Sequence, residues 1–245
     1  PDGALSLHPD SYLVCENGLC TGVFTQPPDW APQTVIDYGY LLVIPGLNDL
    51  HIHAPQFTFR GLGMDRELMQ WLETYTFPEE AKYKALEYAD EAYTIFADHM
   101  RRSATTRACV FATIHRPATE LLMQKMEETG LVTYVGKVNM DQMSPQYLIE
   151  DTAQSERDTI DWVEATIDRF ARTKPIITPR FIPTCSSQLL AALGRIAADY
   201  NIPVQSHLSE NREEIAIVSK LEPDAASYGH AYDKYGLFGG NSPCV

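Results

Sequence analysis

Long apolar runs are absent from the sequence. No stretch reaches the roughly 18 apolar residues that a membrane-spanning helix requires, so we expect no membrane association. The first ten residues, PDGALSLHPD, lack the basic and apolar regions of a signal peptide, and they lack an initiator methionine. We therefore expect the numbering to begin inside a longer natural protein.

Basic residues are scarce. Lys and Arg number 19 against 33 Asp and Glu, which gives a formal net charge of −14. Proteins that bind the nucleic-acid backbone need a basic surface, so we expect no nucleic-acid partner. The acidic balance is compatible with a small uncharged substrate.

The sequence also lacks a C-x-x-C pair. Its five cysteines are scattered along the chain, at Cys15, Cys20, Cys109, Cys185 and Cys244. An odd number of cysteines without a secretory signal favours reduced thiols and a cytoplasmic location. We interpret the Cys15 and Cys20 spacing as two residues of a hairpin rather than half of a metal site.

The first 42 residues have the pattern of a small β element. Asn17-Gly18 is a strong turn signal between apolar flanks, so residues 11–25 are predicted to form a hairpin. Short strands are predicted to continue through residues 34–46. We expect residues 1–42 to be part of a small β-sandwich domain.

From residue 43 onward, strand patterns alternate with helical ones. Strands are predicted at 105–114, 131–141, 174–181 and 202–210. Between them, helices are predicted after a cap at Asp65, before a stop at Gly130, over 160–170, after Ser186 or Ser187, and over 211–221. This alternation indicates an α/β fold with a parallel sheet. A closed (β/α)8 TIM-like barrel needs ~250 residues, so we expect residues 43–245 to supply its first five to six βα units and to leave it incomplete.

Two histidines one residue apart follow an apolar run in VIPGLNDLHIHAPQ. On a strand, His51 and His53 project to the same face, where they could share one partner. The alternative is two half-exposed histidines after a turn, since H-x-H is common by chance. His207 also ends a predicted strand, and reactive groups of such barrels collect at strand ends. Three neutral imidazoles suit Zn²⁺, with iron also possible.

Glu210 follows His207 in the stretch HLSE. A carboxylate beside a metal can take a proton from water and deliver it elsewhere. The alternative is an acid in the first turn of the following helix, where the helix dipole favours it, and both roles can hold together. Asp49 precedes His51 and is expected to support the ligands from behind.

Five motifs occur in an order and spacing that resemble the guanine deaminase family of the amidohydrolase superfamily. They are PGLNDLHIHAPQ, FATIH, VGKVNMD, ITPRF and QSHLSENREE, and they extend from about Val43 through nearly the whole chain. The resemblance implies one zinc ion per subunit, held by His51, His53, His207 and an aspartate of the last barrel strand. It also implies a proton shuttle at Glu210 and purine contacts at Gln56, Arg180 and Phe181. These residue types suit the chemistry, because an Arg fork matches O6 and N7 of guanine and a Gln amide offers a donor and an acceptor.

The same resemblance implies hydrolytic deamination of guanine to xanthine and ammonia, in purine catabolism or salvage, by a cytoplasmic homodimer. In the family, a further His of the sixth strand and the ligand Asp follow later in the chain. This sequence ends at GGNSPCV, before both. We therefore expect residues 1–245 alone to be inactive.

Other functions are compatible with parts of the pattern. Lys137 could be the carboxylated lysine of a two-metal amidohydrolase, but Arg180 occupies the fourth strand, where that lysine belongs. The H-x-E and P-C-x-x-C motifs of the other zinc deaminases are absent. A hydrolase of another heterocycle remains an alternative, as does a truncated, inactive scaffold, although the three retained histidines argue against a scaffold role for the parent protein.

Overall fold

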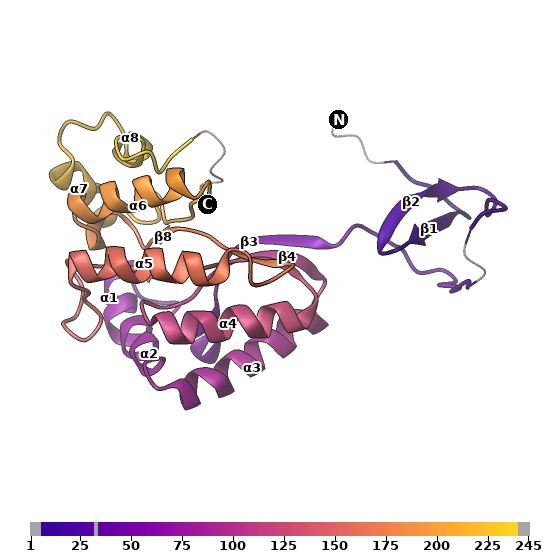
Figure 1. Cartoon of the computed structure of the whole chain (residues 1–245), viewed down its shortest axis with the longest axis horizontal. Coiled ribbons are helices and arrows are strands. Elements are labelled where there is room, and N and C mark those ends of the chain that lie inside the picture. Colours follow the sequence, from indigo (N-terminus) through magenta and orange to yellow (C-terminus); the bar gives the residue numbers. More distant parts are fainter. Residues whose placement is uncertain (1–5, 32–33, 240–245) are drawn as a thin grey trace. The chain divides into compact units, whose positions relative to one another are not determined.

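The protein is described here by a computed structural model that covers residues 6–31 and 34–239. The chain divides into two compact units, residues 1–45 and residues 46–245 (Figure 1). The predicted boundary after residue 42, and the assignment of the first segment to a β-sandwich, stay predictions.

The first unit contains the predicted hairpin. Strands β1 (Tyr12–Glu16) and β2 (Leu19–Phe24) pair antiparallel. Asn17 and Gly18 join them with φ angles of 51° and 79°, the left-handed values that a tight hairpin turn requires. Cys15 lies opposite Cys20 in this ladder, and both thiols are free.

The short strands predicted for residues 34–46 are wrong. The structure assigns no strand to this stretch, and its apolar side chains Val35, Ile36 and Leu41 are more than half exposed. A strand needs a neighbour to satisfy its backbone N–H and C=O groups. No described strand pairs with these residues, so β-branched composition alone does not make them a sheet.

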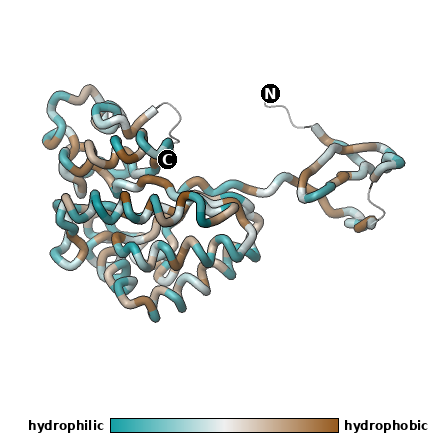
Figure 2. Tube along the Cα trace, viewed as in Figure 1, coloured by the Kyte–Doolittle hydropathy of each residue, from teal (hydrophilic) through white to brown (hydrophobic). Residues whose placement is uncertain are grey.

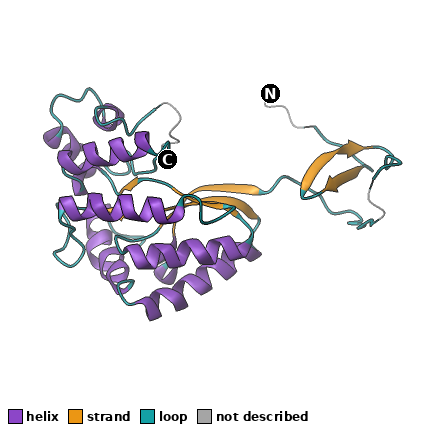
Figure 3. Cartoon of the chain, viewed as in Figure 1, coloured by secondary structure: helices purple, strands orange, loops and turns teal. Residues whose placement is uncertain are grey.

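The second unit is built on parallel strands. β3 (Leu47–His53), β4 (Thr105–Phe111), β5 (Val132–Gly136) and β7 (Thr173–Pro175) are neighbours in that order, and β6 (Val138–Asn139) pairs with β8 (Thr178–Pro179). Figure 3 shows these strands running among the helices. Spatial order that follows chain order, with a helix between successive strands, is the arrangement of consecutive (β/α)8 units.

The strand predicted for residues 202–210 forms only in part. Val204 makes an isolated parallel bridge with Ile177, and the Gln205 N–H donates to the Ile177 carbonyl at 2.9 Å. The His207 N–H still donates to the Arg180 carbonyl at 3.2 Å, but residues 205–211 carry no strand assignment. His207 and Glu210 therefore lie in a loop.

The helices pack side by side in chain order. They are α1 (Leu68–Trp71), α2 (Phe77–Lys82), α3 (Leu86–Arg102), α4 (Arg116–Thr129), α5 (Thr152–Thr166), α6 (Ser187–Asp199), α7 (Arg212–Leu221) and α8 (Tyr228–Asp233). α3 contacts α4, α4 contacts α5, and α5 contacts α6 (Figure 1). Figure 2 shows hydrophobic and hydrophilic residues alternating along them. Their inner faces bury large side chains such as Phe96, Leu122 and Trp162 completely, and this burial holds the helices on the sheet.

Several predicted helix boundaries are confirmed, but the helix predicted over 160–170 is wrong at both ends, because α5 begins at Thr152 behind an Asp151 cap and ends at Thr166. The Ser186 hydroxyl accepts from Leu189 N at the start of α6, and Gly130, with φ 79°, ends α4. The cap at Asp65 is wrong, because α1 begins only at Leu68. Positive φ angles at Gly61 and Gly63 keep the preceding chain in turns, which delays the helix. No helix in the described part of the second unit, or elsewhere among the described residues, has the length and apolar composition to cross a membrane.

Candidate metal centre and active site

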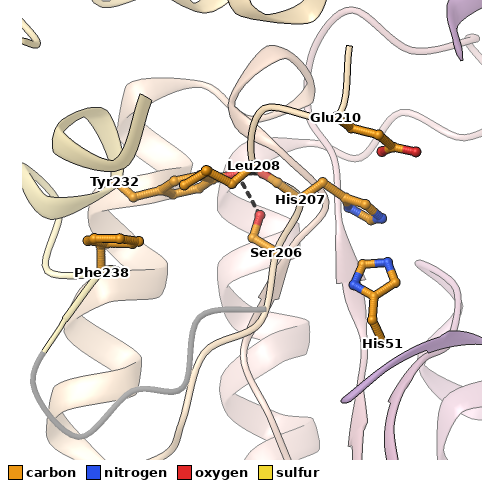
Figure 4. A pocket seen from close by; sticks show the side chains of 7 residues that line it. All are labelled: His51, Ser206, His207, Leu208, Glu210, Tyr232 and Phe238. Carbon is orange, nitrogen blue, oxygen red and sulfur yellow. Dashed lines mark hydrogen bonds between the residues drawn. The ribbon is translucent and has the colours of Figure 1, made fainter. Parts of the chain in front are cut away.

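Three histidines meet at the ends of the strands. His51 and His53 close β3, and His207 comes from the loop after the Val204 bridge. The Nε2 atoms of His53 and His207 lie 2.9 Å apart, and one ring nitrogen from each of the three lies within 4.8 Å of the others. The rings of His51 and His207 lie next to each other (Figure 4), edge-on at an interplanar angle of 80°. Nitrogens that converge in this way are arranged as ligands of one metal ion.

One aromatic ring contacts all three imidazoles. Phe111, the last residue of β4, lies 4.7 Å from His51, 4.4 Å from His53 and 4.8 Å from His207 between ring centroids. The His53 ring stacks on it with an interplanar angle of 18°. Phe111 therefore fixes the ring orientations and removes water from one side of the cluster.

The tautomer of His207 is set by a backbone carbonyl. His207 Nδ1 lies 2.6 Å from the Arg180 oxygen, and a carbonyl can only accept, so Nδ1 carries the proton. Nε2 then keeps its lone pair and points at His53. An orienting acceptor behind the ligating ring is typical of metal-binding histidines.

The surroundings keep the histidines neutral. Burial lowers the pKa of His51, and it lowers the pKa of His53 well below its usual range. Burial, reinforced by the positive charge of Arg180, lowers the pKa of His207 to about 3. Neutral imidazole is the form that binds metal, so these residues fit a metal ion. The Asp49 carboxylate accepts from the His51 backbone N–H at 3.1 Å, and its supporting role for the ligands stays a prediction.

Glu210 lies beside this cluster on an exposed loop. With His51, His207, Leu208 and Tyr232 it lines a pocket of about 430 Å³ (Figure 4). Partial burial and the negative charge of Glu214 raise the pKa of Glu210, while Arg180 opposes the shift. A carboxylate with a raised pKa is closer to the range in which it exchanges protons near neutral pH.

The start of α7 holds Glu210 in place. The buried Glu214 carboxylate accepts from the backbone N–H groups of Glu210 and Asn211 at 2.8 and 3.0 Å, and from the Tyr228 hydroxyl at 2.6 Å. Asn211 completes a capping box with Glu214. Glu214 was not predicted, although the N-x-x-E spacing of the capping box is a usable signal in the sequence.

Helix α8 holds the other end of the loop. The Tyr232 hydroxyl lies 2.6 Å from Ser206 Oγ and donates to the His207 carbonyl at 2.8 Å. Its ring stacks on Tyr228 at 5.5 Å. No local sequence pattern predicts these contacts, because Tyr232 lies 25 residues after His207.

The three residues predicted as purine contacts lie close to the histidines but do not line this pocket. Phe181 is buried, with its ring 6.4 Å from that of His207. Arg180 is only 2% exposed and is paired with Glu80. Gln56 is half-buried on the 3-10 helix Ala54–Phe59, which directly follows His53. Their roles stay predictions.

Lys137 is occupied elsewhere. Its side chain is fully buried, and its Nζ atom lies 2.6 Å from Glu150 Oε1 and donates to the Val138 carbonyl at 3.2 Å. Among the described residues, the His, Cys, Asp and Glu side chains that converge in this way are those of His51, His53 and His207. This environment is that of a structural ion pair.

Residues 42–242 match the amidohydrolase family, and the chain belongs to this family. The α/β fold of the amidohydrolase type is thereby confirmed.

Within this family, the chain is similar to several guanine deaminases. The chain is 42% identical over 206 residues to the guanine deaminase of Dictyostelium discoideum, covering 84% of this chain and 46% of that protein. It is 37% identical over 247 residues to the guanine deaminase of Escherichia coli K12, covering 99% and 55%. The crystal structure of the guanine deaminase from C. acetobutylicum with bound guanine superposes with a TM-score of 0.92 at 44% identity, over 96% of this chain and 56% of that one. The chain therefore spans about half the length of these relatives.

Proposed function

We propose that the protein containing this chain hydrolyses guanine to xanthine and ammonia. The observation that carries the proposal is the convergence of three neutral imidazoles beside the Glu210 carboxylate. The similarity to a guanine-bound deaminase supports the choice of substrate. The proposal places the protein in purine catabolism or salvage.

The metal in this proposal is one zinc ion per subunit, held by His51, His53 and His207. Three imidazole nitrogens without a thiolate suit zinc, and iron suits them less. When bound, the metal supplies a Lewis acid that activates water at neutral pH. The Arg180 carbonyl and Phe111 prepare the ring orientations before the metal arrives.

Glu210 carries the protons. Replacing the C2 amine by a hydroxyl requires a proton on the ring nitrogen beside C2 and another on the departing amine. Glu210 can take a proton from the attacking water and pass it on, because it faces the same pocket as His51 and His207. Its raised pKa suits this exchange.

Gln56, Arg180 and Phe181 recognise the purine. The Arg180 guanidinium offers paired donors to O6 and N7, Gln56 reads a polar edge, and Phe181 lies against the ring. The positive charge of Arg180 lowers the pKa values of His53, His207 and Glu210. This effect supports a position of Arg180 beside the reacting centre.

The decisive experiment replaces Glu210 with Gln in the natural protein that carries this chain. Gln keeps the size of the side chain but cannot transfer the proton, so kcat for guanine should fall ~10²–10⁴-fold. Zinc content, measured by elemental analysis, should stay near one per subunit. A variant that kept its zinc and lost less than tenfold in kcat would place the proton shuttle elsewhere.

The remaining features are proposed from the family resemblance and composition. We propose a cytoplasmic homodimer in which residues 1–42 belong to a small β-sandwich domain and residues 43–245 form the first five to six barrel units. Light scattering of the purified protein tests the oligomeric state, since a monomeric mass at working concentration contradicts the dimer.

A further inference from the structure

Arg180 and Glu80 form a buried ion pair. Arg180 Nη1 donates to Glu80 Oε2 at 2.6 Å, and the two residues are 2% and 1% exposed. They are 100 residues apart in the sequence, so neither local structure nor helix spacing brings them together. The other Glu80 oxygen, Oε1, is buried without a hydrogen-bond partner among the described residues. Arg180 is therefore the charge that compensates this carboxylate.

Helix α2 presents a second contact to the same guanidinium. Phe77 lies three residues before Glu80, on the same helix face, and the Arg180 Cζ atom lies 5.2 Å from the Phe77 ring centroid. One face of the planar guanidinium is thus against a ring and one edge is against a carboxylate. Such a group has little freedom to rotate.

The same helix also holds the element that carries Gln56. The Tyr83 hydroxyl, just after α2, donates to the Pro55 carbonyl at 3.3 Å, and the Thr58 hydroxyl donates to Glu79 at 2.7 Å. Pro55 and Thr58 flank Gln56 within two residues. Two of the three predicted purine contacts are consequently positioned from α2.

The ion pair with Glu80 fixes the direction in which the other Arg180 donors point. Among the described residues, Glu80 is the hydrogen-bond acceptor of the Arg180 side chain, which leaves Nε and Nη2 for other acceptors. We propose that Glu80 is a positioning residue that aims these donors at the 6-oxo group of a purine. This inference rests on the proposed function, because it assumes that Arg180 contacts the ligand.

Preorganisation explains why a buried pair suits this place. A buried ion pair adds little net stability compared with apolar residues, but a buried charge that loses its partner is costly. A guanidinium already fixed in direction loses less freedom when a ligand binds, so more of its interaction appears as affinity. Removing Glu80 should therefore weaken recognition of the oxo group specifically.

The test compares two ligands that lack the C2 amine, so that the proposed reaction cannot consume them. Hypoxanthine carries the 6-oxo group and purine does not. Their dissociation constants are measured by calorimetry on the natural protein and on Glu80→Gln, Glu80→Asp, Arg180→Ala and Glu150→Gln. Glu150→Gln is the matched control, because it breaks the buried Lys137–Glu150 pair, which has the same 2.6 Å separation. Melting temperatures report the general loss of stability.

The preference for hypoxanthine over purine should fall about tenfold in Glu80→Gln, the size expected for a misaligned hydrogen bond to a charged group. In Glu80→Asp, which keeps the charge but withdraws it by one methylene, it should fall about threefold. Glu150→Gln should lower the melting temperature without changing the preference. If Glu80→Gln does not fold, Glu80→Asp decides.

An unchanged preference in the Glu80 variants, or an equal fall in Glu150→Gln, overturns the inference. Arg180→Ala distinguishes a failure of the positioning role of Glu80 from a failure of the purine contact of Arg180. If it removes the preference while the Glu80 variants do not, only the positioning role fails. If Arg180→Ala leaves the preference intact, the assigned purine contact is wrong and the inference falls with it.

Discussion

The loop that carries Glu210 should depend on one buried carboxylate. Glu214 is fully buried and accepts three hydrogen bonds, two from backbone N–H groups and one from Tyr228. Glu214→Ala leaves the buried Tyr228 hydroxyl unpaired, at about 1–3 kcal/mol, and removes half of a capping box worth about 1 kcal/mol. The backbone donors lie near the surface, where water can replace the carboxylate. We therefore expect a loss of about 3 kcal/mol in the free energy of unfolding.

Urea denaturation measures this loss, and Glu213→Ala is its control. Glu213 lies in the same first helical turn but is exposed, so its removal costs only a dipole interaction of about 0.3–1 kcal/mol. Tyr228→Phe should cost about 1 kcal/mol in the natural background but recover stability in Glu214→Ala, because there it removes the hydroxyl that was left unpaired. Since Glu210 loses its anchor, kcat should also fall in Glu214→Ala.

The result that refutes this reasoning is equal stability of Glu214→Ala and Glu213→Ala. Additive losses in the double variant would likewise show that Tyr228 and Glu214 act separately. Either outcome would mean that the loop is held by its contacts with Tyr232 rather than by the cap.

Three further predictions concern recognition, metal and pH. Arg180→Ala should raise KM for guanine, since an unpaired buried O6 costs ~1–3 kcal/mol, and adenine should stay a poor substrate; equal turnover of adenine and guanine would contradict the role of Arg180. His207→Ala should abolish zinc binding in elemental analysis. His230→Ala should not, because His230 is outside the histidine cluster and its Nδ1 accepts from the Ala226 backbone N–H. Burial, then the charges of Lys84 and Lys137, lower the pKa of His115 from its ordinary 6.5 to about 4. Protons therefore bind to His115 of the unfolded chain at a higher pH than to His115 of the folded chain, and this residue should lower the stability as pH drops from 6.5 to 4, by at most about 1.4 kcal/mol per pH unit. His115→Gln should reduce the slope of that part of the profile by this amount, while the lowered pKa values of His51, His53 and His207 keep a slope of the same sign.

Local patterns predicted the elements whose signals are local. Asn17-Gly18, Gly130 and Ser186 each determine a turn or a helix end through their own backbone or hydroxyl, and all three were predicted correctly. The strands expected at residues 34–46 failed because a strand depends on a partner that may be far along the chain. The same dependence shortened the stretch around Val204 to a single bridge.

The site was predicted unevenly for the same reason. His51, His53 and His207 were singled out because each ends a strand pattern and together they match a family motif, and the structure brings their rings together. The contacts of Glu80 and Tyr232 were not predicted, because they join residues 100 and 25 positions apart. A sequence identifies chemically distinctive side chains more readily than it identifies the residues that aim them.

One feature of Arg180 matters for redesign of specificity. Its side chain faces Glu80, whereas its carbonyl accepts the His207 Nδ1–H, so two separate interactions originate at one position. The carbonyl belongs to the main chain, and a saturation library at position 180 therefore varies the side chain without deleting the acceptor. Proline also keeps the carbonyl, but it removes the N–H that donates to the Asn139 carbonyl at 3.3 Å. Selections for altered ligand preference can therefore vary the side chain at position 180 together with its buried partner Glu80, while the backbone acceptor that orients the His207 ring stays in place.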